Sequence, residues 1–184
     1  MSTTVAIILI AVILLAAVAA WAFLQRRSTT LRRRFGPEYD RALGEYGNRL
    51  RAEQALERRA ERTEKYHIRS LAREEQQRFI EEWRIAQGRF VDDPALAIRE
   101  ADELVSEVMR QRGYPMAEFD RRAEDLSVDH PHVIRNYRTA HDIAVADQQG
   151  TASTEDLRRG MVHYRELFDE LLEIQPAQMP GRRS

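Results

Sequence analysis

The sequence has no cysteine in its 184 residues. This absence excludes disulfide bonds, thiol catalysis, cysteine-bound zinc and iron–sulfur clusters. Lysine is almost absent as well, since Lys65 is the only lysine among 29 basic residues. It lies within a run of charged residues, so we discount it as a Schiff-base site.

The sequence motifs of common catalytic sites are also missing. There is no Gly-x-Ser-x-Gly elbow, no glycine-rich phosphate loop and no dinucleotide fingerprint. Glu64 and His67 have the spacing of half a di-iron motif, but the second half does not occur. β-Branched residues never alternate with polar ones over five positions, so no strand is predicted. We therefore expect an all-α fold with no assignable catalytic residue and no cofactor.

Most of the chain has no net positive charge. Residues 35–184 contain 24 basic and 30 acidic residues, a net charge of −6. Nucleic-acid binding requires a basic face, so nucleic acid is not an expected partner.

The most informative feature that is present is an uninterrupted apolar run from Val5 to Leu24. As a helix these residues would cover roughly 30 Å, the hydrocarbon thickness of a bilayer. A buried core helix would usually be shorter and have a polar stripe. A cleaved signal peptide would need a basic segment before the run, and residues 1–4 contain none. We expect an uncleaved single-pass transmembrane anchor over residues 1–27.

Basic residues follow the run directly. They are Arg26, Arg27, Arg32, Arg33 and Arg34, and no acidic residue occurs before Glu38. Positive charge stays on the cytoplasmic side, which predicts a cell-membrane protein with its amino terminus outside and its soluble part in the cytoplasm. The reversed topology is the alternative. The arginines either only set the topology or also bind anionic lipid headgroups, each gaining about 1 kcal/mol.

The remaining chain divides by composition. We expect a basic juxtamembrane collar at residues 28–36, a charged helical stalk at 37–66, a helical bundle at 67–174 and a disordered polar tail at 175–184. Gly36 and Pro37 interrupt the helix that leaves the membrane. The stalk is expected to be one helix of about 40 Å with few apolar positions.

Apolar spacing of three and four residues predicts about five short helices in the bundle. The first runs from about Arg73 to Val91, and Asp93 with Pro94 begins the next. The last helix starts with a capping-box pattern at Ser153. Its wide apolar stripe fits a buried core helix better than a partner surface.

Histidines are the best candidates for a site. Asp129, His130 and His132 lie within four residues, and His141 follows on the next expected helix. Such groups can bind a metal, although a complete site needs further ligands, for example from His163. The alternative is that Asp129 caps a helix, with His130 exposed and His132 packed or hydrogen-bonded.

Several segments resemble a group of uncharacterised single-pass bacterial membrane proteins that are frequent in actinobacteria. These segments are residues 34–40, 90–94, 125–132 and 154–157, and the resemblance covers most of residues 31–173. Related sequences often have Ser-Pro-Glu near Ala72, which this chain lacks. The resemblance implies membrane association and a helical soluble domain, and it implies no activity.

From these features we expect a membrane-anchored helical interaction or scaffolding protein rather than an enzyme. Its expected partners are the lipid bilayer and either another protein or a second copy of the chain. The alternative is a membrane-tethered metal-dependent enzyme or metal sensor that uses Asp129, His130 and His132.

Overall fold

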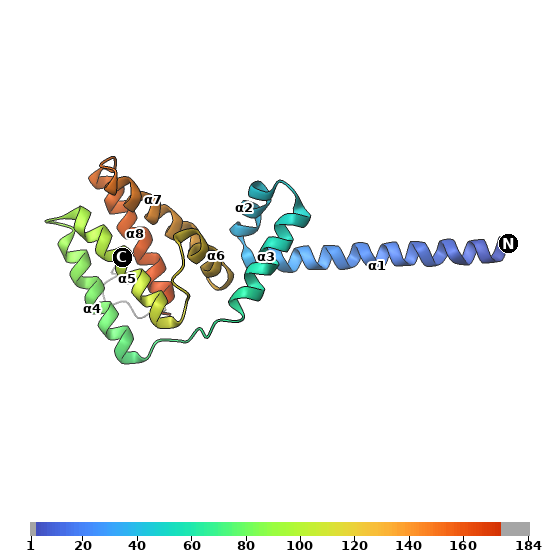
Figure 1. The fold of residues 1–184 in the computed structure, drawn as a ribbon, viewed down its shortest axis with the longest axis horizontal. Coiled ribbons are helices and arrows are strands. Elements are labelled where there is room, and N and C mark those ends of the chain that lie inside the picture. The colour runs from blue at the N-terminus through green and yellow to red at the C-terminus, as the bar shows by residue number, and fades with distance from the viewer. Residues whose placement is uncertain (1–2, 174–184) are drawn as a thin grey trace, which may run out of the picture. The chain divides into compact units, whose positions relative to one another are not determined.

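The computed structural model describes residues 3–173 of the chain, without the side chains of residues 3–6, 9, 23 and 24. The predicted all-α class is confirmed, because the described residues form helices and no strand (Figure 1). The helices are α1 (Thr3–Phe35), α2 (Pro37–Tyr46), α3 (Arg49–Thr63), α4 (Arg73–Arg89), α5 (Pro94–Arg112), α6 (Phe119–Asp129), α7 (Ile134–Gln148) and α8 (Thr154–Leu171). The tail expected at 175–184 lies outside the described residues.

The chain folds as two compact units, Met1–Arg58 and Arg59–Ser184. The division falls within α3 and not at residue 66, where the charged segment was expected to end. The reason is that the last part of α3 contacts α6. Arg59 forms an ion pair of 3.0 Å with Glu124, and the Tyr66 hydroxyl donates a 2.9 Å hydrogen bond to Asp125.

In the first unit, α1 is one helix that includes the apolar run and continues to Phe35. Its segment Ile10–Phe35 is long and apolar enough to cross a membrane, and none of its apolar window, of mean hydropathy 1.6, is buried. The helix break expected at Gly36 and Pro37 is present, and the collar expected at 28–36 is a basic segment that leads up to it. Most of this collar is the last part of α1, where Leu31 and Phe35 are buried.

The charged segment after Gly36 is helical, but the expectation of a single helix of about 40 Å is wrong. Gly47 ends α2 in a left-handed conformation with φ of 61°. Asn48 then begins α3, since its side chain accepts a 2.8 Å hydrogen bond from the Leu50 backbone N–H. A glycine at a helix end followed by an asparagine cap is a strong stop-and-start signal.

The second unit is the helical bundle. Its helix α8 packs against α5 and α7, while α4 packs on α5 and α6 on α7. The apolar stripe of α8 is buried, as the sequence favoured, and Phe168 stacks on Trp83 of α4 at 4.7 Å between ring centroids. Both predicted caps form: Asp93 accepts from the Leu96 N–H at 2.9 Å, and Ser153 exchanges hydrogen bonds with Asp156.

Candidate functional site

The four candidate metal ligands have different neighbours. Asp129 is the last residue of α6, so it does not cap the following helix, which begins at Ile134. It is exposed and accepts a 3.2 Å hydrogen bond from the Tyr114 hydroxyl. His132 is exposed in the turn between α6 and α7, and it has no hydrogen-bond or ion-pair partner within residues 3–173.

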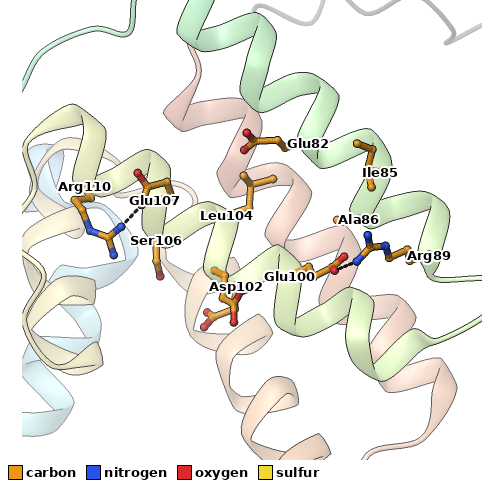
Figure 2. Close-up of a pocket in the computed structure, with 11 residues that line it drawn as sticks. Glu82, Ile85, Ala86, Arg89, Glu100, Asp102, Leu104, Ser106, Glu107 and Arg110 are labelled. Carbon is orange, nitrogen blue, oxygen red and sulfur yellow. Dashed lines mark hydrogen bonds and ion pairs between the residues drawn. The ribbon is translucent and has the colours of Figure 1, made fainter.

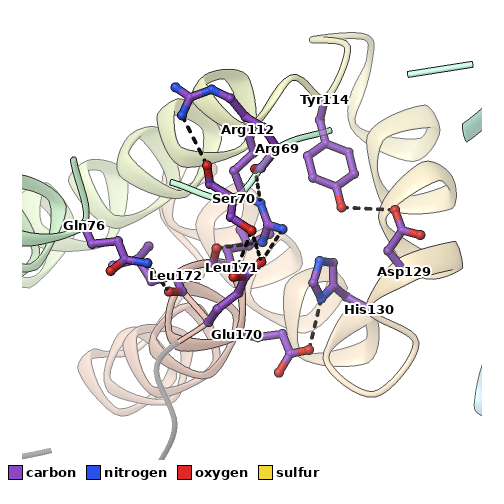
Figure 3. A network of polar contacts seen from close by, with 11 residues as sticks. Arg69, Ser70, Gln76, Arg112, Tyr114, Asp129, His130, Glu170, Leu171 and Leu172 are labelled. Carbon is purple, nitrogen blue, oxygen red and sulfur yellow. Dashed lines mark hydrogen bonds and ion pairs between the residues drawn. The ribbon is translucent and has the colours of Figure 1, made fainter. Parts of the chain in front are cut away.

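His130 is buried, contrary to the expectation that it would be exposed. Its Nδ1 lies 3.0 Å from Glu170 Oε1 on α8 (Figure 3). The pair is a hydrogen bond for a neutral imidazole and an ion pair for a protonated one. It links the α6–α7 turn to α8, which is a structural role.

His141 lies flat on the Phe119 ring, with 3.5 Å between ring centroids. Burial lowers the pKa of His141, and its Nδ1 is buried without a hydrogen-bond partner in the described part of the chain. It lines a pocket of about 410 Å³ together with Asp120 and Asp142. Across the described residues, no three His, Asp or Glu side chains are grouped closely enough to bind a metal ion, so these candidates do not form one site.

The five arginines that were expected beside the membrane differ in their surroundings. Arg27 pairs with Glu57 of α3, and Arg32 pairs with Asp40 of α2 at 2.9 Å. Arg26, Arg33 and Arg34 are exposed on α1. Part of the predicted basic cluster therefore fixes α1 to the helices that follow it, and sequence proximity alone could not reveal this.

Net charge differs in sign between the two units. Residues 1–58 contain nine basic and five acidic residues, a net of +4, whereas residues 59–184 contain 20 basic and 25 acidic residues, a net of −5. The positive unit is the one that contains the apolar helix α1. Positive charge is thus concentrated in the same unit as the apolar helix.

Arg112 is the centre of a polar network that no sequence motif predicted (Figure 3). The side chain is only 6% exposed. It donates to the Leu171 carbonyl at 2.7 Å, to Glu173 at 2.8 Å and to the Arg69 carbonyl at 3.3 Å. These bonds satisfy a carbonyl at the end of α8 and attach the segment before α4, so the network stabilises the fold.

A groove of about 580 Å³ lies along α4 and α5 (Figure 2). Its apolar lining is Ile85, Ala86 and Leu104, and Ile85 is 49% exposed. Its charged lining has five carboxylates and two guanidinium groups, which give a net charge of −3. The carboxylates are Glu82, Glu100, Asp102, Glu103 and Glu107, and the guanidinium groups are those of Arg89 and Arg110. An apolar floor with an acidic rim suits a basic amphipathic segment.

Both arginines of the groove already have acidic partners within it. Arg89 pairs with Glu100, and Arg110 pairs with Glu107 (Figure 2). Asp102 accepts a 2.6 Å hydrogen bond from the Tyr164 hydroxyl of α8, and burial together with this carboxylate raises the pKa of Tyr164. The exposed Glu103 has no ion-pair partner in the described residues, so its charge is available to a ligand.

The groove could not be predicted from the sequence. In the sequence its acidic residues look like those of any helix face that is exposed to solvent. Only the antiparallel packing of α4 on α5 brings Glu82 close to Glu103 and Glu107. Carboxylates at three- and four-residue spacing on α5 were a weak signal in a chain with 32% charged residues.

Comparison with known protein families, curated proteins and solved structures found no match for this chain.

Proposed function

We propose that this protein is a single-pass membrane protein whose helical bundle binds a basic amphipathic segment of a partner protein. The amino terminus lies outside the cell and the bundle in the cytoplasm. The observation that carries the proposal is the combination of an unburied apolar helix with a positively charged flank and a separate acidic bundle with its own core. Membrane attachment then concentrates the bundle at the cytoplasmic surface.

Three points support the anchor. The apolar window of α1 has no burial within the chain, so its apolar side chains need another apolar environment. Leu15, for example, is 75% exposed. The helix satisfies its own backbone hydrogen bonds, as lipid requires. Basic residues on one side only give the orientation.

Topology is tested by cysteine labelling, because the chain has no cysteine of its own. Ser2→Cys and Ser184→Cys variants are expressed separately and treated in intact cells with a membrane-impermeant maleimide. We expect labelling of the first variant only. Labelling of the second alone would establish the reversed topology and overturn the proposed orientation.

The binding role of the groove rests on its charge and its apolar floor. A defined probe is a fluorescent helical peptide of leucine and lysine, titrated against the detergent-solubilised full chain. We expect the double variant Glu82→Arg, Glu103→Arg to weaken binding by about tenfold or more, since rim charges govern such encounters. The control Glu118→Arg, Asp142→Arg has the same change in net charge at exposed residues outside the groove.

Equal loss of affinity in both double variants would mean that net charge alone drives binding, and it would refute a specific groove. Retained affinity in both would refute the role of these carboxylates. Near- and far-ultraviolet circular dichroism of each variant establishes that the bundle is folded.

A further inference from the structure

We propose that the exposed face of α3 rests on anionic lipid headgroups, so that the hairpin of α2 and α3 forms a second, peripheral membrane contact beside the anchor. This face consists of Leu50, Arg51, Gln54 and Arg58. The inference rests on the proposed membrane anchoring by α1 and adds a lipid-binding surface that lies outside the apolar run and its arginine cluster.

The first argument is depth along α1. The apolar run ends at Leu24, and α3 contacts α1 at Arg27 through Glu57. Three helical residues advance roughly 5 Å, and the headgroup region adds about 5–8 Å on each side of the hydrocarbon core. The contact between α1 and α3 therefore lies at headgroup level.

The second argument is the order of the two short helices along α1. Contacts of α2 with α1 involve later residues of α1, namely Tyr39 with Ser28 and Asp40 with Arg32. Of the two helices, α3 has the contact nearest to the apolar run, one residue before the first contact of α2. Figure 1 shows α3 crossing the carboxyl-terminal part of α1.

The third argument is that the hairpin is held firmly in this position. Within the unit, Ser28 and the Tyr39 hydroxyl are 2.9 Å apart, and this hydroxyl donates to Glu53 at 2.8 Å. Arg49 donates to the same carboxylate at 2.9 Å. Phe35 and Leu56 are fully buried. Hydrogen bonds and packing together fix α3 relative to α1, so its exposed face has one orientation.

The fourth argument is that charge is segregated around α3. Arg51, Gln54 and Arg58 follow one another at helical spacing and are exposed, and Leu50 beside them is 52% exposed. Neither arginine has an ion-pair partner in the described part of the chain. The acidic residues of α3 within this unit are both paired with arginines, Glu53 with Arg49 of α3 itself and Glu57 with Arg27 of α1. The exposed face therefore presents positive charge and one leucine, which suits an anionic interface.

The test uses the full chain reconstituted into vesicles of phosphatidylcholine, with or without phosphatidylglycerol. A Gln54→Cys variant has a single thiol, which is labelled with an environment-sensitive fluorophore. A lipid with a nitroxide on its headgroup serves as quencher. We expect quenching to be at least about twofold stronger in the anionic vesicles and to fall at high salt, as electrostatic contact requires.

The double variant Arg51→Gln, Arg58→Gln in the labelled chain should abolish the difference in quenching between the two kinds of vesicle. The matched control is Arg73→Gln, Arg135→Gln, which removes two exposed arginines of the second unit and should leave the difference intact. Weak quenching in both lipids, or quenching that is insensitive to lipid charge and to the α3 variants, would overturn the inference.

Failure of the anchor is recognised separately. Flotation of the vesicles after alkaline carbonate extraction reports whether the chain spans the bilayer. A chain that is extracted by carbonate contradicts the proposed anchoring, whereas a chain that floats but lacks headgroup quenching contradicts only the α3 contact. The comparison of the two lipids with the unsubstituted arginines stands even if the α3 variant does not fold.

Discussion

The Tyr164 hydroxyl donates a 2.6 Å hydrogen bond to Asp102, and this bond joins α8 to α5 beside the acidic groove. Tyr164→Phe removes the donor from a half-buried carboxylate. We expect the free energy of unfolding to fall by about 1.5 kcal/mol, the lower end for bonds to a charged group, because water can reach part of Asp102. Urea denaturation of the full chain in detergent measures it.

Tyr137→Phe is the matched control for this bond. The Tyr137 hydroxyl is buried and has no hydrogen-bond partner in the described residues. Its removal should leave stability unchanged or raise it slightly, because the ring remains and an unsatisfied polar atom is lost. Equal destabilisation by the two variants would show that the Tyr164–Asp102 bond contributes nothing of its own.

Gly160 lies where α8 packs closely against Ile98 of α5 and Ile143 of α7. A Cβ atom there would lie 2.8 Å from Ile98 Cδ1 and 3.1 Å from Ile143 Cγ2. For Gly160→Ala, the better helix propensity of about 1 kcal/mol offsets a clash that the flexible end of Ile98 can relieve. Gly160→Val adds two methyl groups and should cost about 2–3 kcal/mol.

Thermal unfolding of both Gly160 variants is compared with that of Gly88→Ala. Gly88 is helical in α4, and a Cβ there meets no atom within 4 Å. This control should stabilise by up to about 1 kcal/mol. A Gly160→Val protein as stable as the original would mean that α8 can move away from α5 without loss.

Gly113 ends α5 with φ of 97°, and a Cβ atom would lie 2.5 Å from the His67 carbonyl oxygen. Gly113→Ala should therefore lower the free energy of unfolding by about 2 kcal/mol or more. Gly150→Ala separates the steric clash from the cost of the left-handed backbone, since Gly150 has φ of 71° and open space around it. That variant should lose only about 1 kcal/mol, the cost of the left-handed backbone.

Some helix boundaries in the bundle and the buried face of α8 could be predicted from the sequence because they depend on neighbouring residues. The Ser153–Asp156 cap and the start of α4 at Arg73 are local features of this kind. The groove and the Arg112 network could not be predicted. Arg112 reads as an ordinary basic residue in the last turn of a helix, yet its partner Leu171 is 59 residues away. Only the folded bundle brings these two residues together.

The break between α2 and α3 in the charged segment also depends on contacts that form only in the folded chain. The segment 37–66 was expected to be one long helix that packs little, because it has few apolar residues. In the fold, small residues such as Ala42 and Ala52 are buried with Tyr39 and Phe35. Alanines let helices pack closely, so a thin apolar stripe was enough for a hairpin.

The capping carboxyl of Asp156 gives a prediction about pH. Hydrogen bonds from the Ser153 hydroxyl and backbone N–H, with the nearby Arg159, lower its pKa to about 2 from an ordinary 3.8. A carboxyl whose pKa is lowered by folding stabilises the fold above the unfolded pKa and loses that contribution as pH falls through the folded value. The stabilisation should be complete above about pH 4 and lost toward pH 2.

Melting curves of the original chain and of Asp156→Asn between pH 2 and pH 6 isolate this effect from the other carboxylates. The difference in melting temperature between the two proteins should shrink as the pH falls below about 4. A constant difference over the whole range would show that the cap does not depend on ionisation of Asp156.

The unbroken course of α1 from its apolar run to Phe35 has a mechanical consequence. If α1 spans a bilayer as proposed, this helix without a hinge passes any tilt of its apolar part directly to the helices packed on its far end. Bilayers of different thickness impose different tilts on a helix of fixed apolar length. The angle between the α2–α3 hairpin and the membrane plane would then change with bilayer thickness, because α1 has no hinge to absorb the tilt.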